Sequence, residues 1–207
     1  MKISYAITVC NELEEVSRLL NFLHQYKRSE DEICVLLDKP KASQELLDEL
    51  HYWSSKDIIT LKESTFQGHF ADWKNELTAM CSGDYIFQID ADEYLHPHFI
   101  ENIPFVLEHN SAVELYAVPR VNTVEGLTQE HIQRWRWNVN EKGWINWPDF
   151  QTRIYRNNGE VKWKNKVHEV LDGHKEFAYL PMEEEWALYH PKTIERQEKQ
   201  NNYYESI

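Results

Sequence analysis

Residues 82–97 read SGDYIFQIDADEYLHP, and this segment joins a turn signal, a strand signal and three nearby acids. Ser-Gly-Asp is typical of a turn. The run of aromatic and β-branched residues at 85–89 predicts a buried strand. Pro97 is expected to be the first residue of a helix, where its missing N–H costs nothing. The three carboxylates therefore lie where a strand ends.

In an open α/β sheet, ligands bind beyond the carboxyl ends of the strands, so Asp90, Asp92 and Glu93 are placed to hold something cationic. Alternation along extended backbone directs Asp90 and Asp92 to the same side, which suits one hard metal ion with oxygen ligands. The alternative is a helix N-terminus carrying acids, where the helix dipole favours negative charge. Asp-x-Asp is a weak signal in an acidic chain, and its position after a hydrophobic strand is what favours the metal site.

Composition limits the classes of function. A chain of 207 residues is expected to form one domain with a substantial core. Its net charge of -13 argues against a nucleic-acid surface or an anionic membrane face, because phosphate binding needs a basic patch. No apolar run has the length of a membrane span and no signal-peptide pattern precedes the first strand, so we expect a soluble cytoplasmic protein. Cys10, Cys34 and Cys81 lack Cys-x-x-Cys spacing and are expected to be buried, reduced thiols.

Strand and helix patterns alternate through the first half of the chain. Strands are expected at 3–9, 32–37, 57–61, 85–89 and 113–118, and amphipathic helices near 13–23, 46–53, 68–81 and 97–106. This order predicts βαβ units and a mainly parallel sheet with right-handed crossovers. Neither a Gly-x-Gly-x-x-Gly motif after the first strand nor a P-loop is present. The diphosphate of a bound nucleotide would therefore need a metal rather than a glycine cradle.

The alternation ends after Arg120. Residues 122–149 are expected to form a long polar and aromatic loop, which at that length is more often functional than idle. Residues 150–155 and 160–163 predict a β-hairpin that turns at Asn-Asn-Gly. An extended segment at 167–170, a strand at 186–189 and a charged helix at 193–204 are expected to follow.

Five blocks of sequence, in order, resemble the family 2 glycosyltransferases with a GT-A fold. They are TVCNE at 8–12, FADWKN at 70–75, QIDADE at 88–93, PDFQTRIYR at 148–156 and KVHE at 166–169. Each block is weak alone, but the series covers nearly the whole chain. Within the family, the pattern is most similar to bacterial enzymes that add β-linked glucose to the lipopolysaccharide core, and to related phage and viral proteins. A phage or viral member would act in the cytoplasm of an infected cell.

The resemblance implies an α/β fold of GT-A (Rossmann-like) type. We expect a mostly parallel central sheet flanked by helices, a small C-terminal antiparallel hairpin region and a terminal helix. Residues 1–207 would form a single domain, with a nucleotide-sugar binding half at 1–120 and an acceptor-side half at 121–207. The implied activity is the inverting transfer of a hexose from a nucleoside diphosphate sugar, with a UDP-sugar as first candidate. The acceptor would be a hydroxyl of a glycan or a similar molecule.

The resemblance also implies a metal. Mn²⁺ or Mg²⁺ would bridge the diphosphate to Asp92 and, directly or through water, to Asp90. The cation would neutralise charge on the departing diphosphate. His168 is the candidate for a further contact with the metal or the diphosphate, and His190 competes with it. The family's nucleoside pocket maps onto Thr8, Cys10, Glu12 and Asp38. Cys10 replaces a common Tyr of the family, so stacking of the base is not supported at that position.

Inversion also needs a base to accept the proton of the acceptor hydroxyl. Asp149 is our candidate, with Glu169 as the alternative, since the Glu-Asp pair that many family members use is absent. The structural alternative for Asp149 is a turn-former beside Pro148.

Basic and aromatic side chains concentrate around these candidates. Lys74 and Arg153 are expected to contact the diphosphate through charge-assisted hydrogen bonds. The basic cluster of the predicted hairpin region, which could equally be a solvated face, comprises Arg153, Arg156, Lys164 and Lys166. A sugar-stacking acceptor wall is predicted from four Trp residues, about half of them expected in the core: Trp135, Trp137, Trp144 and Trp147.

Two other classes of function compete with glycosyl transfer. A metal-dependent hydrolase or nuclease would use the acids and His168 to activate water, but the sequence has no His-x-x-x-His or His-x-Asp ligand motif. A non-catalytic sugar- or nucleotide-binding module would keep the fold without the chemistry, and the presence of both Asp90 and Asp92 disfavours it. Nucleic acid is not an expected partner. Donor sugar, acceptor and oligomeric state do not follow from the sequence.

Overall fold

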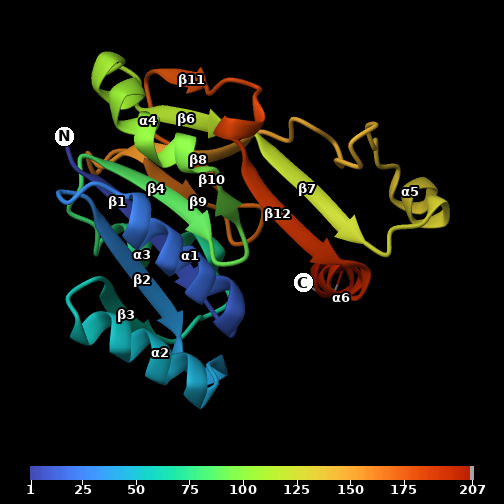
Figure 1. Ribbon diagram of the computed structural model, residues 1–207, viewed down its shortest axis with the longest axis horizontal. Helices are drawn as coiled ribbons and strands as arrows, with labels where there is room; N and C mark the ends of the chain where they lie inside the picture. Colours follow the sequence, from blue (N-terminus) through green and yellow to red (C-terminus); the bar gives the residue numbers. More distant parts are fainter. Residues whose placement is uncertain (206–207) are drawn as a thin grey trace.

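The computed structural model describes residues 1–205, and its centre is a seven-stranded sheet with helices on both faces (Figure 1). In spatial order the strands are β11 (Phe177–Tyr179), β6 (Leu115–Val118), β8 (Gln151–Arg156), β4 (Tyr85–Asp90), β1 (Ile3–Val9), β2 (Glu32–Asp38) and β3 (Thr60–Ser64). Strand β8 runs antiparallel to β4 and β6, and the other pairs in this sheet are parallel. The expected α/β fold with a mostly parallel sheet is confirmed.

The helices cover both faces of the sheet, and each face has its own hydrophobic cluster. Helices α1 (Leu13–Tyr26), α2 (Gln44–Ser55) and α4 (Pro97–His109) pack on one face of the sheet, and α3 (Phe70–Thr78) packs on the other. Alternate residues of the central strands serve the two clusters; Tyr5 faces the first and Ala6 the second. Because both faces are covered, these strands are apolar throughout. A short η1 turn (Lys39–Lys41) follows β2.

Close packing fixes the turn before β4. A Cβ atom at Gly83 would lie 2.7 Å from the backbone N of Ser4, so only glycine fits there. Pro97 is the first residue of α4, as predicted. Among the cysteines, Cys34 is buried while Cys10 and Cys81 are partly exposed, and all three are free thiols.

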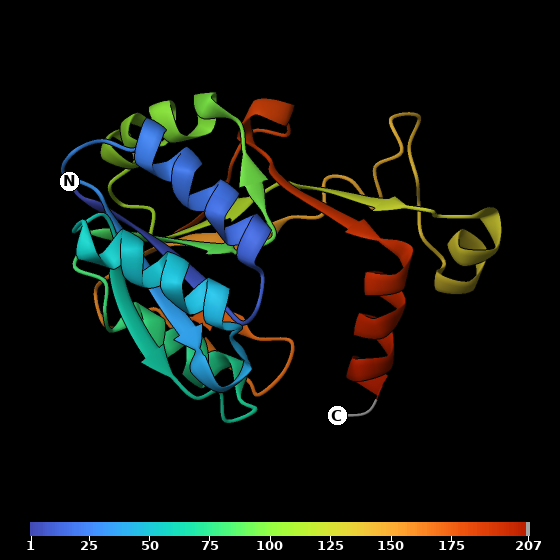
Figure 2. The ribbon, with the colours of Figure 1, turned by 60° about the horizontal axis from the view of Figure 1, so that its bottom comes forward.

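A second layer projects from one end of the sheet (Figure 2). It contains the three-stranded sheet β5 (Tyr94–Leu95), β12 (Leu188–Thr193) and β7 (Arg120–Glu125), followed by helices α5 (Gln129–Trp135) and α6 (Ile194–Glu205). A 3-10 turn, η2 (Glu184–Trp186), precedes β12. We call residues 120–149 the arm. None of the helices in residues 1–205 is long and apolar enough to cross a membrane.

Three sequence-based predictions of secondary structure are wrong. The third strand occupies 60–64 rather than 57–61, because Asp57 adopts a left-handed turn conformation with a φ of 56°. Residues 122–149 are not a single loop, since they contain most of β7 and all of α5. The predicted hairpin does not form, because β8 inserts between β4 and β6, where both faces of the strand are buried. The hairpin that does form joins β9 (Lys162–Lys164) to β10 (Val170–Asp172).

The remaining predicted elements shift at their ends. The extended segment expected at 167–170 is a loop that enters β10 at Val170, and the strand expected at 186–189 runs from 188 to 193. Strand β12 continues through Pro191, because β5 pairs only with Leu188 and Tyr189 and leaves that edge free. The helix at the C-terminal end begins at Ile194, as expected to within one residue.

Candidate functional site

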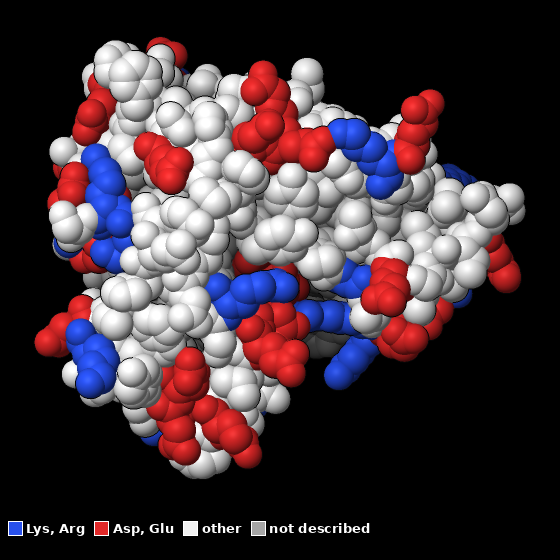
Figure 3. Space-filling model, in the orientation of Figure 1, with Lys and Arg blue, Asp and Glu red and all other residues white. Residues whose placement is uncertain are grey.

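A cavity of about 980 Å³ lies at the carboxyl ends of β1, β2 and β4. Its far wall is built from the arm, β12 and α6, and acidic and basic side chains gather around this hollow (Figure 3). Twelve of the candidate site residues from the sequence line it: Thr8, Cys10, Glu12, Asp38, Lys74, Asp90, Asp92, Asp149, Arg153, His168, Glu169 and His190. The parallel register explains part of this convergence, because Thr8 pairs directly with Asp90.

Asp90 is held by an arginine of the neighbouring strand. Arg153 Nη2 donates to Asp90 Oδ2 at 2.6 Å and to Glu93 Oε1 at 2.8 Å. Burial acts to raise the pKa of the Asp90 carboxyl, but the charges of Arg153 and Lys74 and the hydrogen bond from Arg153 together outweigh it and hold that pKa well below its usual range. Asp90 is ionised at neutral pH.

Glu93 has a structural position. Its side chain is fully buried, its Oε2 accepts from the backbone N of Asp90 at 3.0 Å, and its Oε1 also lies 3.5 Å from Arg120 Nη1. The sequence placed Glu93 with the acids that face a cation, and the cations in the structure are Arg153 and Arg120. Glu93 therefore supports the strand end rather than lining the cavity.

Asp92 faces the cavity and meets a histidine and an arginine. Its Oδ2 lies 3.2 Å from His190 Nε2 and 3.1 Å from Arg196 Nη2 of α6. Burial acts to raise the pKa of Asp92, but the contact with His190 and the charge of Arg196 together outweigh it and lower that pKa below its usual range.

A hydrogen-bond relay runs from Asp92 to Asp149. His190 Nδ1 lies 3.2 Å from Asn122 Oδ1, and Asn122 Nδ2 donates to Asp149 Oδ2 at 2.6 Å. Since the Asn122 amide donates to Asp149, its oxygen faces His190 and accepts from Nδ1–H. His190 Nε2 is then left to face Asp92, donating as an imidazolium or offering a lone pair to a cation as a neutral ring.

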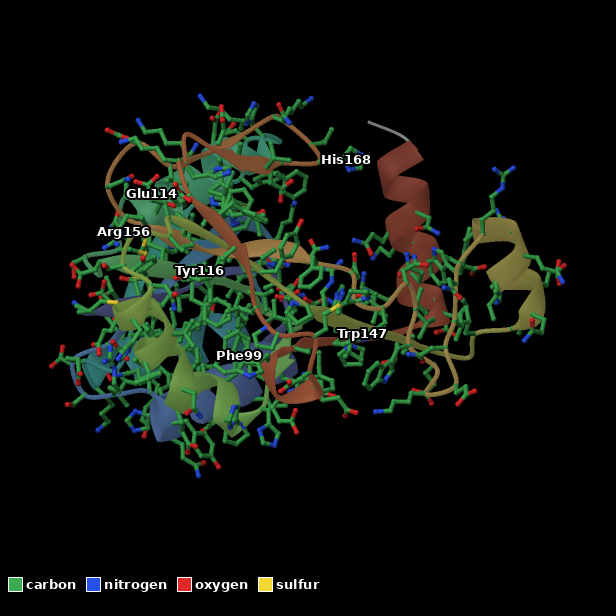
Figure 4. The ribbon with its side chains drawn as sticks, turned by 90° about the horizontal axis from the view of Figure 1, so that it is seen from above. Phe99, Glu114, Tyr116, Trp147, Arg156 and His168 are labelled. Carbon is green, nitrogen blue, oxygen red and sulfur yellow. The ribbon has the colours of Figure 1, made fainter. Side chains whose placement is uncertain are left out.

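The two candidate histidines occupy different walls. His190 is on β12 and contacts Asp92, whereas His168 is at the tip of the loop between β9 and β10 and points toward α6 (Figure 4). Of the two alternatives that the sequence left open, His190 is the one beside the Asp-x-Asp motif.

The two candidate bases differ in their partners. Asp149 Oδ2 accepts from Arg120 Nε at 3.0 Å and Nη2 at 2.8 Å, while its Oδ1 accepts only from Gln151 Nε2, at 3.1 Å. Glu169 Oε1 forms an ion pair with Lys74 Nζ at 2.6 Å, and that ammonium also lies over the ring of Trp163. Asp149 thus keeps one oxygen with a single neutral partner, which leaves it lone-pair capacity to accept a proton.

The predicted basic cluster divides in the structure. Lys74 and Arg153 are buried and line the cavity, and Arg153 Nε has no hydrogen-bond partner among the described residues. Arg156 instead bonds to the carbonyl of Ser111 and stacks over Tyr85. Lys164 and Lys166 are exposed outside the cavity lining.

Sequence reasoning missed a second basic group. Arg120 and Asn122 of β7, with Lys192 and Arg196 from β12 and α6, line the cavity. Burial lowers the pKa of the Lys192 ammonium, and the charges of Arg120 and Arg196 lower it further against the opposing effect of Asp92. The sequence signal for Arg120 was its position at a strand end, beside Pro119. The residues on α6 gave no signal beyond a charged helix.

The cavity wall at the ends of β1 and β2, where the nucleoside pocket was expected, is held by bonds from carboxylates to backbone N–H groups. Glu12 Oε2 accepts from the backbone N of Cys10 at 2.8 Å, and Asp38 Oδ1 accepts from that of Phe66 at 3.0 Å. Phe66 and Phe70 line this wall with their rings 4.8 Å apart. These phenylalanines, which the sequence reading missed, supply the aromatic surface that Cys10 does not.

The four tryptophans of the arm form two pairs of neighbouring rings. Trp135 and Trp137 have ring centroids 4.6 Å apart, and Trp144 and Trp147 have centroids 4.9 Å apart. All four are partly exposed, so the expectation that half of them belong to the core is wrong. Of the four, Trp137 lines the main cavity.

The acidic strand end fits one kind of metal site. No group of three His, Cys, Asp or Glu residues in the described chain is arranged as a protein-only metal cage. Asp90 and Asp92 provide hard oxygen ligands on one cavity wall, which suits a cation that keeps waters and is completed by phosphate oxygens.

Comparisons with known proteins agree with this architecture. The family model described as Glycosyl transferase family 2 matches residues 4–178. The solved structure of S. aureus TarS aligns with a TM-score of 0.63 at 15% identity, over 92% of this chain and 37% of that one. TarS 1–349 in complex with UDP-GlcNAc aligns with a TM-score of 0.57 at 16% identity, over 93% of this chain and 59% of that one. None of the curated proteins matches. At such identities the likeness shows the GT-A fold, and the chain spans only part of each of these structures.

Proposed function

The chain belongs to glycosyl transferase family 2, and from this membership we propose an inverting, metal-dependent transfer of a hexose. The donor is a nucleoside diphosphate sugar, with UDP as the first candidate nucleotide, and the acceptor is a hydroxyl of a glycan or a similar molecule. The observation that carries the proposal is one cavity that contains the acidic strand end, a separate carboxylate and several basic side chains. Residues 1–120 form the donor half of the domain and 121–207 the acceptor half, with Arg153 reaching back to Asp90.

Asp92 and Asp90 hold Mn²⁺ or Mg²⁺ in this proposal. The ion supplies neutralisation of the diphosphate leaving group when it is bound. His190 lies at Asp92 and offers Nε2 as a further ligand, and His168 on the opposite wall remains a candidate for the diphosphate. Arg196 shares the same carboxylate oxygen of Asp92, so it screens that negative charge before the ion binds.

The donor lies along the nucleoside wall. Thr8, Cys10, Glu12 and Asp38 line the base and ribose end, and Phe66 offers a ring for stacking on the base. Lys74 and Arg153 line the cavity beside Asp90 and are the proposed contacts of the diphosphate, where a charge-assisted hydrogen bond is about twice as strong as a neutral one. The solved TarS complexes contain UDP or UDP-GlcNAc, which is why a uridine nucleotide is the first to test.

Asp149 is the proposed base. Its Oδ1 is the oxygen that faces fewer donors, and Arg120 and Asn122 hold the carboxylate in place through Oδ2. The fixed orientation favours proton transfer from an acceptor hydroxyl, because a base must be within hydrogen-bond reach of its proton.

The test is a calorimetric titration of UDP into the protein with and without Mn²⁺, with GDP and TDP as comparisons. We expect Mn²⁺-dependent binding of one nucleotide and its loss in Asp92→Asn. Asp72→Asn, an exposed carboxylate on α3 outside the cavity, is the matched control and is expected to bind like the wild type. Binding of no nucleotide under either condition, or full binding by Asp92→Asn, would overturn the proposal.

A further inference from the structure

A second cavity of about 550 Å³ lies between the arm and the segment around η2. Its lining is Asn140, Glu141, Lys142, Trp144, Trp147, Met182, Glu183, Glu184 and Glu185. Trp147 lies at the base of the arm, next to η2 (Figure 4). None of these residues takes part in the donor site described above.

The lining has the chemistry of a carbohydrate subsite. The rings of Trp144 and Trp147 are inclined at 59°, and both are partly exposed while their neighbour Ile145 is buried. Ile145 therefore packs in the interior, and the two indole rings stay partly exposed. Indole faces bind apolar C–H surfaces, and the Glu and Asn side chains around them accept hydrogen bonds from hydroxyl groups.

Two residues that line the second cavity, Trp144 and Trp147, are close in sequence to the proposed base Asp149. Ile145, Asn146 and Asp149 line the main cavity, whereas Trp144 and Trp147 line the second one. One residue, Pro148, separates Trp147 from Asp149, so their Cα atoms are at most about 7 Å apart. Asp149 and Trp147 are therefore close enough for neighbouring units of one glycan to reach both.

The charged residues around the second cavity limit which glycans it can bind. Four carboxylates and one ammonium line the second cavity, and Lys142 is already paired with Glu184 and stacked 4.5 Å over Trp144. The negative charges of these glutamates repel an anionic glycan. An uncharged glycan meets no such repulsion.

We propose that the second cavity is an acceptor subsite that binds the distal units of an uncharged oligosaccharide, an inference that rests on the proposed glycosyltransferase function. The acceptor is then a chain of several sugars rather than a monosaccharide. The unit at Asp149 reacts, and Trp147 and Trp144 hold the units behind it.

The test is retention of the protein on an immobilised panel of neutral, sialylated or sulfated, and amino-sugar glycans, in the absence of any donor. We expect neutral oligosaccharides to retain the wild type, and Trp147→Ala and Trp144→Ala each to weaken that retention about three- to tenfold. Trp147→Phe keeps an aromatic face and is expected to lose less. Tyr52→Ala, an exposed aromatic on α2 outside both cavities, is the control.

Three outcomes would overturn the inference: no retention by any neutral glycan, stronger retention by anionic glycans than by neutral ones, or retention of both Trp→Ala variants that equals that of the wild type. The UDP titration separates this failure from failure of the proposed function. UDP binding without Trp-dependent glycan binding removes only the subsite. Trp-dependent glycan binding without nucleotide binding removes the transferase activity and leaves a glycan-binding site.

Discussion

The central sheet and the arm are built on different principles. Strands β1, β2 and β4 are almost fully buried, and two hydrophobic clusters hold them. In the arm, only Val121 and Ile145 are buried. Polar contacts position it instead: Arg120 joins Asp149 of the arm to Glu93 under the sheet end. Apolar packing thus fixes the sheet side of the cavity, and a hydrogen-bonded network fixes the arm side.

This difference predicts how each region responds to mutation. Changes in the sheet should act first on stability, because burial contributes most of the folding free energy there. Changes in the arm should act first on transfer, because its side chains are exposed to the cavity.

Asp149→Asn gives the largest expected effect. Removing the carboxylate charge removes the proposed base, so kcat should fall about 10²- to 10⁴-fold while UDP binding stays near that of the wild type. Steady-state kinetics with a productive acceptor, and the nucleotide titration, provide the two readouts. Unchanged turnover with weakened donor binding would assign Asp149 to donor binding. In that case Glu169→Gln should show the loss of kcat instead.

Arg153→Met probes the sheet side of the comparison. Arg153 is 4% exposed, and its loss leaves Asp90 and the buried Glu93 without their shared cation. We expect the free energy of unfolding, measured with urea, to fall by about 3–5 kcal/mol. The double variant Arg153→Met/Glu93→Gln should recover part of that loss, because it removes a buried charge that the single variant leaves with Arg120, 3.5 Å away, as its remaining cation.

Lys162→Ala, an exposed cation on β9, is the control for Arg153→Met and should be near neutral. A fall of less than 1 kcal/mol in Arg153→Met would show that water replaces the guanidinium. The cavity would then be wetter than the buried ion pairs indicate.

Glu32→Gln tests the amino ends of the central strands, which lie opposite the cavity. Glu32 accepts from Lys2 Nζ, Ser4 Oγ and the backbone N of Ser82, each at 2.6 Å. Burial acts to raise the pKa of Glu32, but these bonds outweigh it and lower the pKa from 4.5 to about 2. A lowered carboxyl pKa stabilises the fold fully above pH 4.5, and this contribution is lost as the pH falls from 4.5 toward 2.

The variant should therefore be about 1–3 kcal/mol less stable at neutral pH. It should also lose part of the dependence of unfolding free energy on pH between 4.5 and 2, as measured by urea titrations at several pH values. Glu101→Gln, exposed on α4, is the comparison and should keep the wild-type slope. An unchanged slope in Glu32→Gln would mean that other carboxyl groups carry the acid dependence.

The same contrast explains what the sequence could predict. Apolar runs and amphipathic periods identify β1, β2, β4 and the helices between them, because burial imposes those patterns. The insertion of β8 between β4 and β6 was not predictable from its own pattern. A strand with Ile154 and Tyr155 buried on opposite faces fits a hairpin or a central position equally well, and only long-range pairing decides.

The site divides in the same way. The acidic residues after β4 could be placed because they follow a buried strand, and the family resemblance placed Asp149. The contacts of Arg120, Asn122 and Arg196 could not be placed, because they depend on how β7, β12 and α6 fold back over the cavity. The order of the candidate histidines along the chain likewise does not show that His190 reaches Asp92.

Lys142→Ala, in the arm, gives the smallest expected effect on stability. Lys142 pairs with Glu184 across the second cavity, and their side chains are 59% and 44% exposed. An exposed pair of this kind contributes about 0–1 kcal/mol, because water and salt screen the attraction and two long side chains lose freedom. Urea unfolding of Lys142→Ala should therefore stay within 1 kcal/mol of the wild type, and Glu184→Gln should behave alike. A loss above 2 kcal/mol in either variant would mean that the pair anchors the arm to η2, and that the arm is part of the cooperative fold rather than a surface held by polar contacts.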